Sequence, residues 1–201
     1  MSIRAVFFDF GGVIMRTEYQ APRQKLAERF NMDYDEIDKA VFASASARRA
    51  SLGEISEEEH WTEVLKRFKQ PLSESKSFRE QFFGGDIVDR HLVDYIRSLR
   101  GSFHMGLISN AWSGLRDILA KERLLDLFDT VIISAEVRTV KPSAKIYELA
   151  LEKANVGADE AVFVDDMPEN ILACQKVGMT GVLFNDPEKS LDRLNRVLKS
   201  N

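Results

Sequence analysis

Cysteine is almost absent: the chain has one among its 201 residues, which rules out an internal disulfide and any cysteine-rich metal site. There is also no apolar run near the ~20 residues that a membrane-spanning helix needs. The first residues lack the charged segment, apolar stretch and cleavage site of a signal peptide. We therefore expect a cytoplasmic protein without a membrane partner, with Cys174 buried on a helix.

Positive charge is also limited. Lysine and arginine number 28 against 32 acidic residues, for a net charge of -4. This balance argues against a general nucleic-acid surface. Hydrophobic residues make up 44% of the chain, enough for a substantial core. A chain of this length forms either one domain or one core with an insert.

The most informative segment surrounds Asp9. Residues 5–8 are apolar at every position, which is typical of a buried strand in a parallel sheet. Asp9 follows at once, then Phe10 and the glycine pair Gly11 and Gly12, which permit a sharp turn and a close approach to a ligand. Open α/β sheets bind ligands at this end of their strands. Asp9 is therefore a candidate nucleophile or metal ligand, the alternative being a simple turn former.

Three later segments carry polar side chains in similar settings. Ser109 and Asn110 follow one apolar stretch, Lys141 precedes a helical pattern, and Asp165 and Asp166 follow another apolar run. Each has a structural alternative, as a helix cap or a solvated charge. Together with the first carboxylate they supply a nucleophile, a hydroxyl, a cation and a second carboxylate, in order along the chain.

The chain alternates strand-like and helix-like segments in residues 1–16 and 88–201, which predicts an α/β fold with a doubly wound parallel sheet. Strands are expected at 4–8, 103–108, 130–133, 161–164 and 181–184. Helices are expected at 88–99, 114–123, 144–154, 169–176 and 190–198.

Residues 17–87 show a different pattern of predicted secondary structure, with helical patterns and no convincing strand. Ser56 followed by Glu59 has the form of a capping box at a helix start. We predict a separate α-helical insert over 17–87. Its helices are expected at 20–30, 34–50, 56–68 and 75–82.

The ordered motifs resemble the haloacid dehalogenase-like (HAD) hydrolase superfamily over nearly the whole chain. Its Asp-x-Asp motif is similar to residues 9–13, except that Gly11 replaces the second Asp. Its Ser/Thr, Lys and acidic-pair motifs match Ser109, Lys141 and residues 165–166. The resemblance implies a Rossmann-like core over 1–16 and 88–201, with residues 17–87 as a small α-helical cap.

The resemblance also implies roles for these residues. Asp9 would attack phosphorus and form an aspartyl-phosphate. Asp9, Asp166 and the main-chain carbonyl of Gly11 would bind Mg²⁺. Ser109 would hydrogen-bond a phosphate oxygen, and Lys141 would offset negative charge.

Four further positions are assigned supporting parts by the same resemblance. Gly12 and Asn110 would lie against the substrate. Asp165 would support either Lys141 or the metal shell. Asn170 stands where many members of the superfamily carry another acid.

Gly11 is the main departure from the pattern, because the Asp at that position protonates the leaving group in most phosphatases of the superfamily. Three explanations remain open. The substrate has an easy leaving group, such as an anomeric oxygen; or an acid from the cap, such as Glu18, Glu54 or His60, substitutes; or the reaction is not phosphate ester hydrolysis. Restoring the acid by Gly11→Asp is expected to risk strain in a turn that needs glycine.

The resemblance is closest to the Asp-x-Gly branch that includes α-glucose-1-phosphate phosphatases. We therefore expect a Mg²⁺-dependent phosphatase acting on a small phosphorylated metabolite, a sugar phosphate with the 1-phosphate favoured. A 2-haloacid dehalogenase-like hydrolase and a non-catalytic phospholigand-binding protein are the alternatives. No pattern in the sequence identifies the individual substrate or the group that replaces the missing acid. Nor does any pattern distinguish a monomer from a homodimer.

Overall fold

A five-stranded, all-parallel sheet forms the centre of the computed structural model, which describes residues 2–199. The strand order is β5-β4-β1-β6-β7, so the chain reverses its direction of winding at β1. The predicted α/β fold with a doubly wound parallel sheet is therefore confirmed. The strands are β1 (Ala5–Phe8), β4 (His104–Ser109), β5 (Thr130–Ile133), β6 (Ala161–Asp165) and β7 (Thr180–Leu183).

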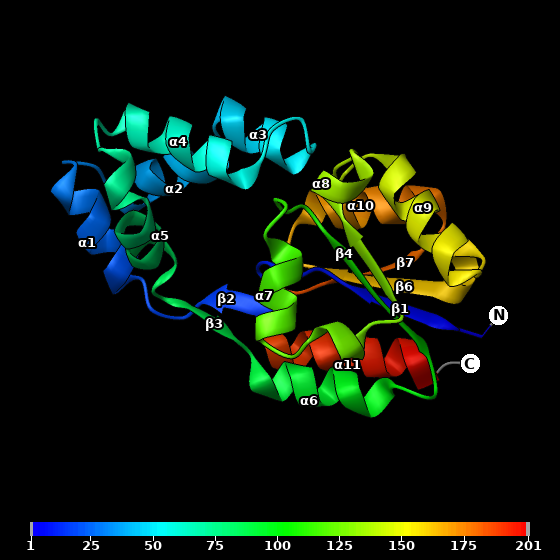
Figure 1. Ribbon diagram of the computed structural model, residues 1–201. Helices are drawn as coiled ribbons and strands as arrows, with labels where there is room; N and C mark the ends of the chain where they lie inside the picture. Colours follow the sequence, from blue (N-terminus) through cyan, green and yellow to red (C-terminus); the bar gives the residue numbers. More distant parts are fainter. Residues whose placement is uncertain (1, 200–201) are drawn as a thin grey trace.

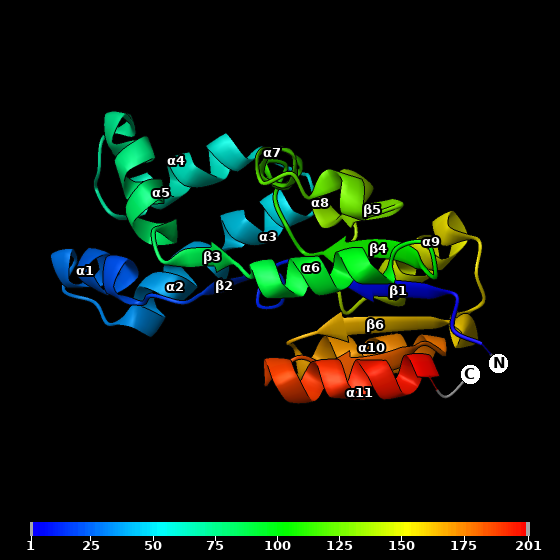
Figure 2. The same ribbon diagram turned by 90° about the horizontal axis from the view of Figure 1, so that it is seen from below.

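Helices cover both faces of this sheet (Figures 1 and 2). On one face lie α9 (Ala144–Ala154) and α10 (Pro168–Val177), and on the other α6 (Arg90–Leu99) and α11 (Pro187–Lys199). The remaining helical segments of the core are short. They are α7 (Leu115–Lys121), α8 (Ser134–Val137) and the 3₁₀ turns η2 (Leu125–Leu127) and η3 (Ala158–Glu160).

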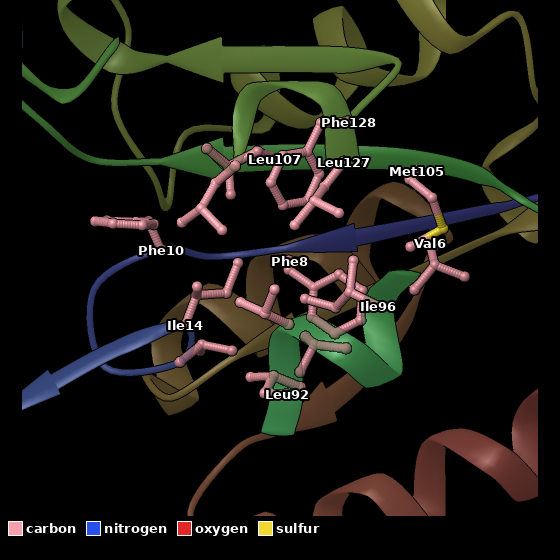
Figure 3. Close-up of a cluster of buried hydrophobic side chains, with 14 of the residues drawn as sticks. Val6, Phe8, Phe10, Ile14, Leu92, Ile96, Met105, Leu107, Leu127 and Phe128 are labelled. Carbon is pink, nitrogen blue, oxygen red and sulfur yellow. The ribbon is translucent and has the colours of Figure 1, made fainter. Parts of the chain in front are cut away.

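Successive side chains of β1 enter different cores, as the period of two in a strand requires. Val6 and Phe8 pack with Leu92 and Ile96 of α6, as Figure 3 shows. Phe7 belongs to the cluster formed with α9 and α10. All three β1 side chains are fully buried, and burial of each contributes about 1.5–3 kcal/mol. This packing fixes the strand that ends at Asp9.

The helical insert lies beyond the carboxyl end of β1 (Figure 1) and has an aromatic core of its own. Trp61, Phe78 and Phe82 are buried at its centre. The expected capping box is present, since Ser56 accepts from the amide of Glu59 and the Glu59 carboxylate accepts in return. The insert contains α1 (Ala21–Arg29), α2 (Tyr34–Phe42), α3 (Ala45–Ser51), α4 (Glu57–Arg67), η1 (Leu72–Glu74) and α5 (Ser75–Phe83).

The single helix expected over 34–50 is wrong: the chain forms two helices there. Ala43 closes α2, and the Ser44 hydroxyl accepts a hydrogen bond from the amide of Ala47 at 3.1 Å to begin α3. A serine side chain competes with the backbone in this way and favours a helix start over a helix interior.

A two-stranded antiparallel ribbon joins the insert to the core, where the sequence indicated no strand within 17–87. It pairs β2 (Met15–Thr17) with β3 (Asp86–Val88), and α6 consequently begins at Arg90 rather than at residue 88. Buried Arg23 of α1 donates to Asp86, which ties the ribbon to the insert. Both predicted domain limits fall inside these strands, and the division into two domains stays a prediction.

Two expectations about the rest of the chain can be compared with residues 2–199. Cys174 is buried on α10, as predicted. Within the same residues, no helix has both the length and the apolar character needed to cross a bilayer.

Candidate active site

The carboxyl ends of three neighbouring strands bring the predicted site residues together. Phe8 lies level with Leu107 of β4 and Val164 of β6. Asp9, one residue further on, therefore lies beside the ends of both strands, where Ser109 and Asp165 are the last residues. The parallel register, set by buried apolar residues, thus converts separate motifs into one cluster.

Lys141 lies between two carboxylates of this cluster. Its Nζ is 2.7 Å from Asp9 Oδ2 and 2.7 Å from Asp165 Oδ2, and the lysine is only 3% exposed. Removing Lys141 would leave two buried carboxylates uncompensated, and an uncompensated buried charge typically costs about 3–5 kcal/mol. The solvated-charge alternative for Lys141 is therefore wrong.

Asp165 is held on several sides. Its carboxylate accepts from Lys141 Nζ, from the amide of Met167 at 2.8 Å and from Asn170 Nδ2 at 3.0 and 3.1 Å. Asn170 is itself buried. Of the two supporting parts expected for Asp165, this geometry favours orientation of Lys141, and the amide of Asn170 acts as a donor where a second acid would repel.

Asn110 uses its side chain to join two loops. Its Oδ1 accepts from the Lys141 amide at 2.7 Å, and its Nδ2 donates to the Lys141 carbonyl at 2.9 Å. The side chain is thus committed to the backbone that carries Lys141, so a substrate contact by Asn110 would come from its main chain. Neither Ser109 nor Asn110 caps the next helix, because α7 begins after Gly114.

The charges of the cluster do not balance. Oxygen atoms of Asp9, Asp165 and Asp166 lie within 4.8 Å of one another. Burial raises the pKa of Asp9 to about 6, opposed by the nearby charge of Lys141 and by a hydrogen bond with Ser109. Burial and the charge of Asp165 also raise the pKa of Asp166. Three carboxylates facing one lysine, with two pKa values raised, form a donor set that fits a divalent cation.

The two glycines after Asp9 have different roles. Gly12 has φ +75°, and a Cβ added there would lie 2.3 Å from Asp166 Oδ2. Glycine at this position therefore allows both the turn and the close approach of Asp166. The hydrogen bonds of the turn use the carbonyl of Phe10, which accepts from Ile14 and Met15, and leave the Gly11 carbonyl unused.

The family of the chain follows from its match to a family model over residues 3–178, described as haloacid dehalogenase-like hydrolase. The chain belongs to this family. The ordered motifs from Asp9 to Asp166 all lie inside the matched range, and the chain is accordingly a HAD-like hydrolase.

Similar proteins include two named phosphatases. The chain is 26% identical to a D-ribitol-5-phosphate phosphatase of Bacteroides thetaiotaomicron, over 88% of this chain and 89% of that protein. It is 28% identical to a phosphorylated carbohydrates phosphatase of Thermotoga maritima, over 88% and 82%. A HAD family enzyme of Bacteroides thetaiotaomicron, solved with magnesium and inorganic phosphate, shares the fold with a TM-score of 0.77 at 18% identity, over 90% and 94% of the two chains.

The structure contradicts the expectation that the turn at Gly11 needs glycine. Its φ is not among the positive values of the chain, and a Cβ added there would meet no atom within 4 Å. The expected strain in a Gly11→Asp variant of this HAD hydrolase is therefore wrong. The position lacks an acid although the backbone has room for one.

The three acids proposed as substitutes are engaged elsewhere. Glu18 pairs with Arg16 at 3.2 Å, and Glu54 is an exposed residue 3.6 Å from Arg49. His60 is fully buried, and burial lowers its pKa to about 4, so its ring is neutral near pH 7. Within residues 2–199, none of these three side chains forms a hydrogen bond or ion pair with Asp9, so none of them is placed as a proton donor against the nucleophile.

The buried His60 predicts a pH-dependent stability. The unfolded chain takes up a proton at the ordinary pKa of 6.5, whereas folded His60 takes one up only near 4. Stability is therefore complete above pH 6.5 and falls as the pH drops toward 4, by roughly 2 kcal/mol at pH 5. Urea unfolding at pH 7 and pH 5 should show a smaller decrease for His60→Phe than for the wild type; equal decreases would contradict the assignment.

Two side chains with a bearing on the site were not predicted. Trp112 and Glu57 lie at the junction of the core and the insert. The signal for Trp112 was a large aromatic residue in a short polar loop, two positions after Asn110. Glu57 carried no signal, because one acid among several at a helix start is normally solvated.

Proposed function

We propose that this HAD-like hydrolase is a Mg²⁺-dependent phosphatase that acts on a small phosphorylated metabolite. The observation that carries the proposal is the buried array of Asp9, Lys141 and Asp165, with Asp166 beside it. Phosphoryl transfer requires an in-line nucleophile and neutralisation of charge on the phosphate oxygens. The array supplies a buried carboxylate, a cation against it and oxygen ligands for a metal.

Asp9 would act as the nucleophile. Its Oδ1 accepts from the amide of Phe10 at 2.7 Å, and Lys141 contacts Oδ2, so the carboxylate is held in one orientation. A bond forms between an Asp9 oxygen and phosphorus while the ester bond breaks, and the leaving oxygen keeps the bonding electrons and takes a proton from solvent. Water then attacks the aspartyl-phosphate, which releases phosphate and regenerates Asp9.

The neighbouring side chains would stabilise the charge that this step moves. Lys141 lies against the nucleophile and offsets the charge that the phosphate brings. Ser109, the last residue of β4 and buried beside Asp9, would turn its hydroxyl to a phosphate oxygen. Gly12, which has no side chain, would let a phosphate oxygen approach the backbone of the turn beside Asp166.

Asp9, Asp166 and the carbonyl of Gly11 would hold the Mg²⁺. When bound, the ion supplies positive charge that neutralises phosphate oxygens and carboxylates together. The set fits because Asp165 is already held by several donors, whereas burial raises the pKa of Asp9 and that of Asp166, so both carboxylates would gain from a bound cation.

A sugar phosphate is the proposed substrate class. It is supported by the names of two similar proteins, which act on D-ribitol 5-phosphate and on phosphorylated carbohydrates. A 1-phosphate is favoured because Gly11 offers no acid, and an anomeric oxygen leaves with less proton help. We further propose residues 1–16 and 88–201 as catalytic core and 17–87 as cap, in a cytoplasmic monomer or homodimer without a nucleic-acid partner.

Two other functions compete with this proposal. A 2-haloacid dehalogenase-like hydrolase would use Asp9 without a metal, and the excess of carboxylates around Asp9 favours the phosphatase. A non-catalytic phospholigand-binding protein would need Ser109 and Lys141 but not a buried carboxylate, whose presence costs stability. Gly11 favours the second alternative, and the retained Asp9 favours the enzyme.

Chelation provides the direct test. EDTA should abolish hydrolysis of p-nitrophenyl phosphate, and added Mg²⁺ should restore it. Asp166→Ala should raise the Mg²⁺ concentration needed for half-maximal activity by roughly 10–100-fold, so that activity partly returns at high metal. The reason is the loss of one of two carboxylate ligands.

Asp117→Ala is the matched control, since Asp117 lies in the first turn of α7 and outside the acidic cluster. Its Mg²⁺ requirement should equal that of the wild type. Activity toward a phosphate ester that is indifferent to EDTA would rule out the metal, and EDTA-resistant dehalogenation would support the dehalogenase alternative. A wild type that binds phosphate without turnover would support the binding protein.

A further inference from the structure

The segment after β4 is anchored to the core at its first residues. Asn110 is bonded in both directions to the backbone of Lys141. Ala111 is bonded in both directions to Ser134 Oγ, at 3.0 and 3.1 Å. These bonds fix the end of the strand that presents Ser109, and the next three residues leave the core.

Trp112, the next residue, enters the aromatic cluster of the insert. Its ring centroid lies 4.3 Å from that of His60, 5.6 Å from that of Trp61 and 5.8 Å from that of Phe42. All three partners belong to α2 or α4. A core residue two positions from Asn110 is thereby packed as a member of the insert.

Glu57 makes a second link at the same place. Its Oε2 accepts a hydrogen bond from the Gly114 amide of the core at 3.0 Å. Its Oε1 accepts from Trp61 Nε1 at 3.2 Å and from the guanidinium of Arg79, both in the insert. One carboxylate thus accepts from three donors and bonds to both parts of the molecule.

A third contact lies close by. Gly53, in the turn between α3 and α4, approaches the core so closely that a Cβ there would lie 2.1 Å from the Ala135 carbonyl oxygen. The Ala135 amide in turn donates to the carbonyl of Ala111. The insert therefore touches the core where the loop after β4 is bonded to α8, the short helix that follows β5.

We propose that Glu57 and Trp112 form a latch that couples the position of the insert to the phosphate-binding end of β4. They are positioning residues, which act through Ser109 and Asn110 and do not touch the reacting atoms. With the latch closed, residues 109–114 are held at both ends, so a phosphate group meets an ordered site. The inference rests on the proposed function only in taking Ser109 and Asn110 as phosphate-binding.

Opening the latch should weaken phosphate binding. The end of residues 109–114 that contacts the insert would be released and would gain conformational freedom. Binding of a phosphate would have to remove that freedom again, at a cost in conformational entropy. By linkage, a phosphate that binds the ordered segment must also favour the closed latch. The latch is thus expected to affect KM more than kcat.

Gly114→Ala tests the latch with one added methyl group. The new Cβ would lie 2.2 Å from Glu57 Oε2, which can move only by giving up the Gly114 amide. The backbone of Gly114, with φ -76° and ψ -9°, accepts alanine without strain. The substitution removes the link without altering any side chain of the insert.

Activity provides the first readout. Gly114→Ala and Trp112→Ala should raise the KM for p-nitrophenyl phosphate and the inhibition constant of inorganic phosphate roughly tenfold, the scale of one hydrogen bond to a charged group. Trp112→Phe should recover most of the loss. The matched control is Phe68→Leu, a cluster residue that packs on Phe30 and Phe78 and not on Trp112. Its KM should stay at the wild-type value; equal effects in all variants would overturn the latch.

Fluorescence provides a readout that does not depend on turnover. Trp61 and Trp112 are the two tryptophans of the chain. Trp61→Phe removes one of the three donors to Glu57 but keeps an aromatic ring beside Trp112 and leaves Trp112 as the sole emitter, so quenching in this variant is the reference. Adding Gly114→Ala should raise acrylamide quenching of Trp112 roughly twofold or more, as the ring leaves the insert. Unchanged quenching would overturn the latch. Increased quenching in a protein without phosphatase activity would instead retain the latch and reject the proposed function.

Discussion

Asp9→Asn is expected to lower phosphatase activity by at least ~10³ while the protein stays folded. The amide keeps the size of the carboxylate and can still accept a hydrogen bond from Lys141, but it cannot form the aspartyl-phosphate. Because burial raises the pKa of Asp9 to about 6, the fold disfavours the ionised carboxylate at neutral pH. The neutral amide should therefore unfold at the same temperature as the wild type or higher.

The measurement pairs p-nitrophenyl phosphate turnover with thermal unfolding. Asp186→Asn is the control, because Asp186 lies at the start of α11, where asparagine caps as well as aspartate does. The control should keep full activity. An Asp9→Asn protein that retains a tenth of the wild-type rate would reject Asp9 as the nucleophile. A gain in thermal stability with loss of activity would show that the site trades stability for function.

Sequence patterns located the parts of the fold that carry long apolar runs. β1 and β6 are buried at every position, so periodicity and flanking polar residues were enough to find them and the acids that follow. β2 and β3 were not predicted, because each has only three residues and no side chain of β2 is fully buried. Such short ribbons depend on their partner rather than on their own pattern.

The site shows the same division between local and tertiary information. The grouping of Asp9, Ser109, Lys141 and Asp165 was expected from the order of the motifs and the family resemblance, and in the structure the parallel strand register places Asp9 beside Ser109 and Asp165. The burial of His60, which makes its ring neutral, depends on residues from several elements and has no local signature. Whether position 11 accepts a side chain depends on its backbone φ. The sequence does not reveal whether the φ of a glycine is positive.

The Glu57 and Trp112 contacts were equally hidden, since both form between segments more than fifty residues apart in the chain, for example from Glu57 to Gly114. Composition and periodicity describe each segment alone. What joins the insert to the core is complementarity of single side chains, a carboxylate among donors and an indole among aromatic rings. These residues become visible only once both segments are placed.

The missing acid at Gly11 should make the rate depend steeply on the leaving group. General acid catalysis contributes roughly 10²–10⁴ in rate. Without it, aryl phosphates and sugar 1-phosphates should be hydrolysed much faster than a 6-phosphosugar, whose alkoxide leaves poorly. The comparison is kcat/KM for matched 1-phosphate and 6-phosphate sugars. Equal or faster turnover of the 6-phosphate would mean that recognition by the insert, or an acid brought in with the substrate, sets the preference.

The Gly11→Asp variant tests the same idea by adding the missing acid, which should raise activity toward the 6-phosphate. A side chain at position 11 meets no atom within 4 Å of its Cβ and needs no unusual backbone angle, so the new carboxyl group should be accommodated. It would stand two residues after the nucleophile, the position of the leaving-group acid in most phosphatases of the superfamily. We expect the 6-phosphate rate to rise roughly 10²-fold and the 1-phosphate rate to change little. Gly11→Asn, of the same shape without the acid, should leave both rates unchanged; an equal rise in both variants would exclude proton donation as the cause.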